Sequence, residues 1–226
     1  MARFISSIGI ITGKLGGVVF KRRGNKTYVS KAPGHLKPSK DPATKLRRKK
    51  FAWVGKFASA VNSSPLLKSL WNSYSTRSLS SFNKIFKQVF NTFSSLDYTG
   101  PIVFTPGGGF ALTGSSVVFG KSSIFVEAGS PLSGSRIDPA VELSVVAAGI
   151  LVLSDPENES FPKEFFLHVQ SGKIPVSLQN SLVFIIPLTG TDLSTYEQYH
   201  IKEAFLSLIT LDASEKPVHY SEVITC

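Results

Sequence analysis

The sequence is poor in cysteine and in uninterrupted apolar runs, and both shortages narrow the classes of protein it can belong to. Its one cysteine, Cys226, is the last residue, so an intramolecular disulfide is impossible and a small disulfide-stabilised secreted scaffold is excluded. The longest candidate for a membrane span, residues 102–126, is interrupted by Pro106, five glycines and Lys121. It therefore lacks the ~18 consecutive apolar residues that a transmembrane helix needs. We expect no membrane span.

A convincing export signal is also missing. Arg3 precedes an apolar stretch over residues 4–11, but two serines and a glycine interrupt that stretch. No small-residue cleavage site ends it. We therefore expect a protein made in the cytoplasm.

Acidic residues are nearly absent from the first part of the chain. Residues 1–96 hold 19 lysines and arginines but one acid, Asp41, and carry a formal charge of +18. Residues 97–226 hold 6 basic and 14 acidic residues and carry −8, so the whole chain has +10. The basic part suits a polyanion or an acidic partner surface. The acidic part can attract the basic part of another copy, so head-to-tail assembly is physically reasonable.

Apolar residues are plentiful enough for a packed core. Hydrophobic residues make up 42 % of the 226 positions, and 17 of them are phenylalanine. This composition excludes wholesale disorder and fits one large domain or two small ones.

The first 40 residues predict a basic hairpin followed by an extended arm. Two short β-prone runs flank the turn at Gly24-Asn25, which is typical of a hairpin. Residues 32–40 then contain two prolines, a glycine and two lysines, which indicates an extended, solvated segment.

Residues 41–96 predict three helices. Asp41-Pro42 and Ser64-Pro65 each place a capping residue before a proline, as at helix starts. Apolar residues then recur at helical spacing in three groups. These are Leu46, Trp53, Val54, Phe57 and Val61; Leu66, Leu67, Leu70, Trp71 and Tyr74; and Leu79, Phe82, Phe86, Val89, Phe90 and Phe93.

From residue 97 to 226 the period changes to that of strands. Eight β-prone segments are separated by Gly, Pro, Asn, Asp and Ser. They are residues 102–105, 117–119, 124–127, 141–153, 165–170, 182–187, 204–211 and 218–225. We predict an α+β protein whose basic hairpin, arm and short helices precede an antiparallel β-sandwich, immunoglobulin-like in its strand number. The expected domains are 1–40, 41–96 and 97–226, with the last boundary at Gly100-Pro101.

No local pattern predicts catalysis, a metal or a cofactor. Residues 114–122 resemble a nucleotide-binding P-loop, but five residues separate Gly114 from Gly120 where the motif has four, and a strand rather than a helix follows. The four histidines are scattered without metal-ligand spacing. We therefore expect a protein that is not an enzyme.

The candidate contact residues are basic. They are Lys14, Lys21, Arg22, Arg23, Lys26, Lys45, Arg47, Arg48, Lys49 and Lys50. One interpretation is contact with nucleic-acid phosphates, which predicts salt-dependent affinity. The other is contact with acidic surfaces of neighbouring subunits. We favour the second, because the acidic half supplies such a surface in every copy, and Trp53 and Phe57 fit a buried stripe better than a base-stacking platform.

The N-terminal half resembles a family of uncharacterised bacterial proteins and phage structural proteins. The resemblance rests on residues 13–20 (GKLGGVVF), Tyr28-Val29-Ser30, the spacer from Pro33 to Pro38, the helix around 47–57 with Trp71 after it, and Ser81-Phe82-Asn83. Residues 96–103 (LDYTGPIV) are similar to a short strand that opens the β-rich part of the bacterial proteins. Ser30 stands where the family has arginine, and Ala43-Thr44-Lys45 replace a glutamine-rich helix start.

This resemblance implies a structural protein of a phage or phage-like particle, located in the virion or the cytoplasm. It transfers no catalytic residues. The implied partners are other copies of the chain and other structural proteins of the particle, and nucleic acid is the alternative partner. A third possibility, a sandwich that binds carbohydrate or another surface, rests on fold analogy alone.

Overall fold

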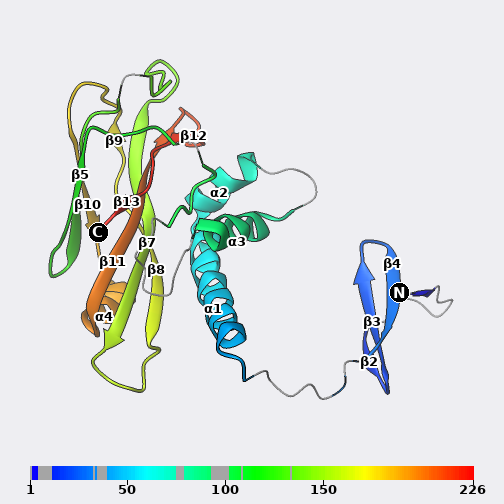
Figure 1. Cartoon of the computed structure of the whole chain (residues 1–226). Coiled ribbons are helices and arrows are strands. Elements are labelled where there is room, and N and C mark those ends of the chain that lie inside the picture. Colours follow the sequence, from blue (N-terminus) through cyan, green and yellow to red (C-terminus); the bar gives the residue numbers. More distant parts are fainter. Residues whose placement is uncertain are drawn as a thin grey trace. The chain divides into compact units, whose positions relative to one another are not determined.

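The structure is a computed structural model that describes residues 2–4, 12–32, 34, 40–74, 79–92, 102–107, 109–132 and 134–226 (Figure 1). It is an α+β structure whose named strands pair antiparallel. The chain forms two compact units, Met1–Lys45 and Leu46–Cys226. The first unit therefore ends a few residues beyond the hairpin and arm predicted over 1–40.

The N-terminal unit is a small antiparallel sheet. Its strand order is β1-β4-β3-β2, from β1 (Ala2–Phe4), β2 (Gly13–Leu15), β3 (Val18–Arg23) and β4 (Lys26–Lys31). Gly24 has a φ of 60° in the two-residue turn between β3 and β4, a conformation that glycine adopts without steric cost. The predicted hairpin is therefore present as β3–β4. Most of the predicted arm lies outside the described residues.

All three predicted helices are present, the first two begin at their predicted caps, and the third begins at Ser81, two residues after the Leu79 that opens its predicted stripe. They are α1 (Pro42–Ser63), α2 (Pro65–Ser73) and α3 (Ser81–Thr92). The Thr44 amide donates to the Asp41 carboxylate at 2.8 Å, and the Leu67 amide donates to the Ser64 hydroxyl at 3.5 Å, so both N-caps are confirmed. Leu46 is an exception to the predicted apolar stripe. It is 56 % exposed, because α1 joins the core only from Trp53 onward.

Two antiparallel sheets and one short helix make up the rest of the second unit. The three-stranded sheet has the order β10-β6-β5, from β5 (Ser115–Phe119), β6 (Ser123–Ala128) and β10 (Leu182–Pro187). The six-stranded sheet has the path β12-β11-β7-β8, from β7 (Ser144–Pro156), β8 (Glu164–Gln170), β11 (Tyr199–Leu211) and β12 (Pro217–Tyr220). The short strands β9 (Ile174–Pro175) and β13 (Ile224–Thr225) pair with β7 and β11, and α4 (Gly190–Glu197) precedes β11.

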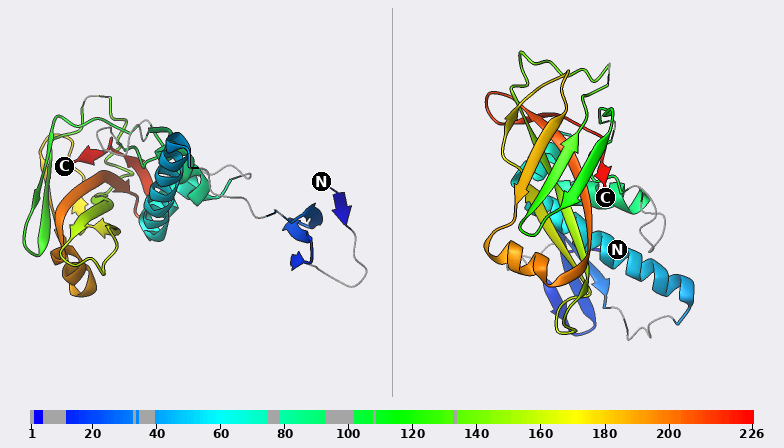
Figure 2. Two further views of the ribbon diagram at one scale, coloured as in Figure 1. Left: turned by 60° about the horizontal axis from the view of Figure 1, so that its bottom comes forward. Right: turned by 90° about the vertical axis from the view of Figure 1, so that its left-hand side faces the viewer.

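Strand β7 lies at the centre of a three-layer arrangement. Its odd-numbered residues, such as Leu151 and Leu153, share a core with the three-stranded sheet. Its even-numbered residues, such as Ile150 and Val152, share a second core with the helices. The helices thus cover the face of the large sheet opposite the three-stranded sheet, as Figures 1 and 2 show. This double burial explains the nearly continuous apolar run in β7.

Three expectations need correction. The segment 218–225 was predicted as one strand, but it forms the two short strands β12 and β13, with residues 222–223 in neither. The segment 102–105 was predicted as a strand, but it forms no ladder. Ile102 and Phe104 are buried beneath the helices, and the Trp71 indole donates to the Phe104 carbonyl at 2.9 Å. The segments predicted as separate domains, 41–96 and 97–226, share the second core from residue 46 onward, because the helices bury their apolar stripes against β7 and β11. The predicted boundary at Gly100-Pro101 lies outside the described residues.

Candidate interaction surfaces

One face of the N-terminal sheet gathers four basic residues. Residues directly opposite each other in antiparallel strands share a face, and so do alternate residues of one strand. The register pairs Lys14 with Val19, Lys21 with Tyr28, and Arg23 with Lys26. All the basic residues among these are exposed. We call this surface, Lys14, Lys21, Arg23, Lys26 and Tyr28, the basic face.

The opposite face of the same sheet is mainly apolar. It carries Leu15, Val18, Phe20 and Val29, together with Arg22 and Lys31. Leu15 is 70 % exposed, and the Arg22 guanidinium donates to the Gly24 carbonyl at 2.8 Å. The structure therefore separates Arg22 from the other hairpin residues that the sequence grouped with it.

The other predicted contact residues lie on the first turns of α1. Lys45, Arg47, Arg48 and Lys49 are exposed, and Lys50 is half-buried. The Lys50 ammonium lies 4.4 Å from the centre of the Phe90 ring, a cation–π contact. Successive helical residues are about 100° apart, so this run surrounds the helix instead of forming one stripe. The hairpin set and residues 47–50 belong to different compact units.

An acidic end of the second unit was missed by the sequence reasoning. The connection from β7 to β8 lies beside the start of β11, because Pro156 pairs with Tyr199 and the Glu157 amide donates to the Gln198 carbonyl at 2.9 Å. Figure 1 shows α4 at the same end of the sheets. The acids gathered there are Asp155, Glu157, Glu159, Glu164, Glu197 and Glu203. Lys163 and Lys202 accompany them, and Lys56 of α1 lines a pocket together with Glu164.

Two acids of this acidic end oppose each other electrostatically. Glu203 lies opposite Val152, and Glu164 lies opposite Ser154, so both occupy the same face of the large sheet. Burial raises the pKa of Glu203, and the nearby Glu164 raises it further. The excess of acids over lysines at this end makes the acidic end suited to a basic partner.

An apolar strip crosses the outer face of the three-stranded sheet. Phe125 of β6 lies between Val118 of β5 and Ile185 of β10 in the register, and Val183 is two residues from Ile185. These four side chains are 43–60 % exposed. The three-stranded sheet faces the viewer in the right-hand view of Figure 2. Strand β10 lies at one edge of this sheet. Exposed apolar edge strands are typical sites of association with another chain.

Comparison of the chain with known proteins identified no related protein. No family model, curated protein or solved structure matches the chain. Within the described ranges, no three His, Cys, Asp or Glu residues are grouped so that they could hold a metal ion. Nor does any helix in those ranges have both the length and the apolarity to cross a membrane.

Proposed function

We propose that this protein is a non-enzymatic structural subunit of a phage or phage-like particle, in which the basic N-terminal region contacts neighbouring subunits. The observation that carries the proposal is the segregation of charge between two compact units. The basic face lies on the first unit, and the acidic end lies on the second. The resemblance of the N-terminal half to phage structural proteins supports the kind of assembly and a location in the virion.

Complementary patches at different places on one chain favour a head-to-tail contact. The basic face of one copy binds the acidic end of the next, and repetition of this contact forms a ring or a filament. The apolar strip around Phe125 and Ile185 supports the same view, because contiguous exposed apolar side chains often belong to an association surface. Other structural proteins of the particle are the further partners.

We also propose that the β-rich part is an immunoglobulin-like sandwich. Its sheets have the orders β5-β6-β10 and β12-β11-β7-β8. Read along the chain, these orders correspond to strands A-B-E and G-F-C-C′ of the immunoglobulin fold. The two sheets share the core that contains Val126, Leu151 and Phe184. This arrangement supplies a rigid body whose ends are free to contact neighbours.

Nucleic-acid binding is the second candidate function. Tyr28 lies opposite Lys21 on the basic face, and aromatic rings among cations suit the stacking of bases beside phosphate contacts. In this alternative the basic face of the N-terminal sheet and residues 45–50 contact phosphates. The β-rich part takes no part in binding.

Sedimentation of the full-length chain with and without duplex DNA tests both functions. The variant Lys21→Glu/Arg23→Glu reverses two charges on the basic face. The matched control Arg22→Glu/Lys31→Glu makes the same charge change on the opposite face of the sheet. We expect the unmodified chain to self-associate without DNA at low salt, and the first variant, but not the control, to remain monomeric.

A different sedimentation result would favour nucleic-acid binding over self-association. A chain that is monomeric alone, shifts only with DNA and releases it as salt rises supports nucleic-acid binding. Equal behaviour of the two double variants would remove the basic face from either function.

A further inference from the structure

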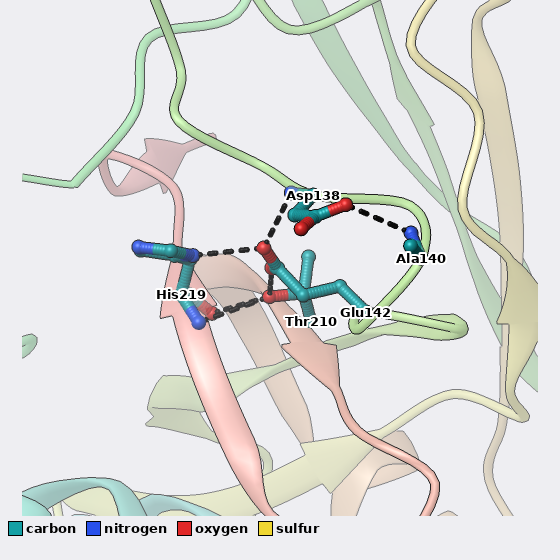
Figure 3. A network of polar contacts seen from close by, with 5 residues as sticks. All are labelled: Asp138, Ala140, Glu142, Thr210 and His219. Carbon is teal, nitrogen blue, oxygen red and sulfur yellow. Dashed lines mark hydrogen bonds and ion pairs between the residues drawn. The ribbon is translucent and has the colours of Figure 1, made fainter.

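A buried carboxylate orients the one histidine of β12. Glu142 lies just before β7 and is 1 % exposed. It accepts hydrogen bonds from the Asp138 amide at 2.8 Å, from the Thr210 hydroxyl and from the His219 ring at Nδ1, 3.0 Å away (Figure 3). Because a carboxylate only accepts, Nδ1 is the donor and carries the proton. This pairing fixes both the plane and the tautomer of the imidazole ring.

The second ring nitrogen of His219, Nε2, is on the side of the ring away from Glu142, as Figure 3 shows. The side chain of His219 is 39 % exposed, and it lines a pocket of about 620 Å³. With the proton on Nδ1, the neutral ring accepts a hydrogen bond at Nε2 from a donor such as a hydroxyl, and the protonated ring donates one from the same atom.

The described lining of this pocket is basic and aromatic. Arg136 supplies a guanidinium, Tyr74 and Tyr220 supply two rings whose centres are 5.8 Å apart, and no lining residue is acidic. The Tyr220 hydroxyl donates to the Gly107 carbonyl, which holds the second ring in place. Arg136 has a φ of 59°, an uncommon conformation for a residue with a side chain. Asp155 and Glu215 adopt the same conformation elsewhere in the chain.

We propose that this pocket binds a small organic anion that also carries hydroxyl groups, of the class of an acidic sugar. Arg136 pairs with the carboxylate or phosphate, because its planar fork matches either group. His219 accepts a hydrogen bond from a neighbouring hydroxyl at Nε2. The tyrosine rings contact the apolar C–H face of the sugar ring. This inference is independent of the proposed assembly, since none of these residues belongs to the basic face or the acidic end.

Titration of the full-length protein with three probes, followed by calorimetry and by NMR of the histidine rings, tests the proposal. The probes are glucuronate, glucose 6-phosphate and glucose. We expect saturable binding of at least one of the two anions, with a dissociation constant of about 1 mM or lower, and no binding of glucose. The His219 ring signals should shift on binding. Comparison of the two anions decides between a carboxylate and a phosphate ligand.

Two variants and a control make the test specific. Arg136→Asn removes the charge but suits the left-handed backbone, and it should weaken anion binding about 10- to 100-fold, the contribution of one charge-assisted hydrogen bond. His219→Gln tests the second contact. Lys121→Asn removes a charge from the exposed β5–β6 turn outside the pocket and should change nothing. Failure of both anions to bind, equal binding of glucose, or binding unaffected by Arg136→Asn would overturn the proposal.

Discussion

At the scale of single residues, Gly149 is the described glycine at which an added Cβ atom would lie closest to a neighbouring atom. It lies in the middle of β7 between Leu206 of β11 and Val169 of β8. A Cβ atom there would lie 1.9 Å from the Phe205 carbonyl oxygen, and backbone atoms cannot move aside as a flexible side chain can. The close approach of β7 and β11 at this position thus requires glycine.

We therefore expect Gly149→Ala to lower the free energy of unfolding by about 3 kcal/mol, the upper part of the usual range for overpacking. Thermal denaturation should show a melting temperature about 6–12 °C lower. Gly172→Ala is the control, because no atom lies within 4 Å of the position of its Cβ. An unchanged melting temperature for Gly149→Ala would contradict the close approach of the two strands.

Glu203 links stability to pH. Burial and the neighbouring Glu164 raise its pKa above the ordinary value of 4.5, so the folded state favours the protonated carboxyl. The stability that protonated Glu203 contributes is complete below pH 4.5 and is lost as the pH rises through the raised pKa. At neutral pH the charged form therefore opposes folding.

Substitution Glu203→Gln should remove this loss. We expect the unfolding free energy of the unmodified chain, measured in urea, to fall relative to that of the variant as the pH rises from 4.5. At neutral pH the variant should be the more stable of the two. The exposed neighbour Glu157→Gln serves as the control for removing an acid from the same end. Parallel curves for the variant and the unmodified chain would show that burial of Glu203 has no energetic consequence.

At the scale of elements, the two helix caps should behave differently although their sequences are alike. Asp41 and Ser64 each precede a proline and each accept a backbone hydrogen bond. The first turns of α1 are exposed, whereas Leu67 and Leu70 place α2 in the core. Loss of the first cap should therefore fray one helix end, and loss of the second should affect global stability.

Alanine substitution at both caps tests this difference. Asp41→Ala should speed hydrogen exchange of the amides over residues 44–46 about fivefold, which corresponds to about 1 kcal/mol, at an unchanged melting temperature. Ser64→Ala should instead lower the global unfolding free energy by about 1 kcal/mol. A fall in melting temperature for Asp41→Ala would mean that the start of α1 contributes to the cooperative core.

The strands and helices could be predicted from the sequence wherever local signals coincide with burial. Caps at Asp41 and Ser64 and the alternation of β6 and β10 are such signals, and these elements lie where predicted. The segment 102–105 has the apolar character of a strand, but its carbonyl at Phe104 is satisfied by the Trp71 indole instead of a ladder. No local pattern reveals such a distant partner.

The surfaces were harder to predict than the elements. The basic residues of the hairpin are obvious in the sequence, and strand alternation places Arg22 on the face opposite to that of Lys21 and Arg23. Only the register shows that Lys14 and Lys26 share the face of Lys21. The acidic end joins residues 155–164 to residues 197–203, which meet because β7 pairs with β11. Glu142 and His219 are 77 positions apart, so their contact depends on the whole sheet. Sequence spacing alone contains none of these contacts.

At the scale of the whole molecule, the division into two units predicts that the larger one is independent. The described core residues all lie between Trp53 and Ile224, and none belongs to the N-terminal sheet. Removal of residues 1–40 keeps Asp41, which caps α1, and removes the whole of the basic face. The remaining chain therefore loses the basic face but no part of either core.

We expect the chain of residues 41–226 to unfold in one cooperative transition, with a melting temperature within about 2 °C of the full-length value. In sedimentation at low salt we expect it to remain monomeric and the full-length chain to associate. Adding the shortened chain to the full-length chain should cap the assemblies, because its acidic end still accepts a basic face but it offers none in return. If the shortened chain assembles as well as the full-length one, the subunit contact lies within the second unit, and the apolar strip around Phe125 and Ile185 becomes the surface that explains it.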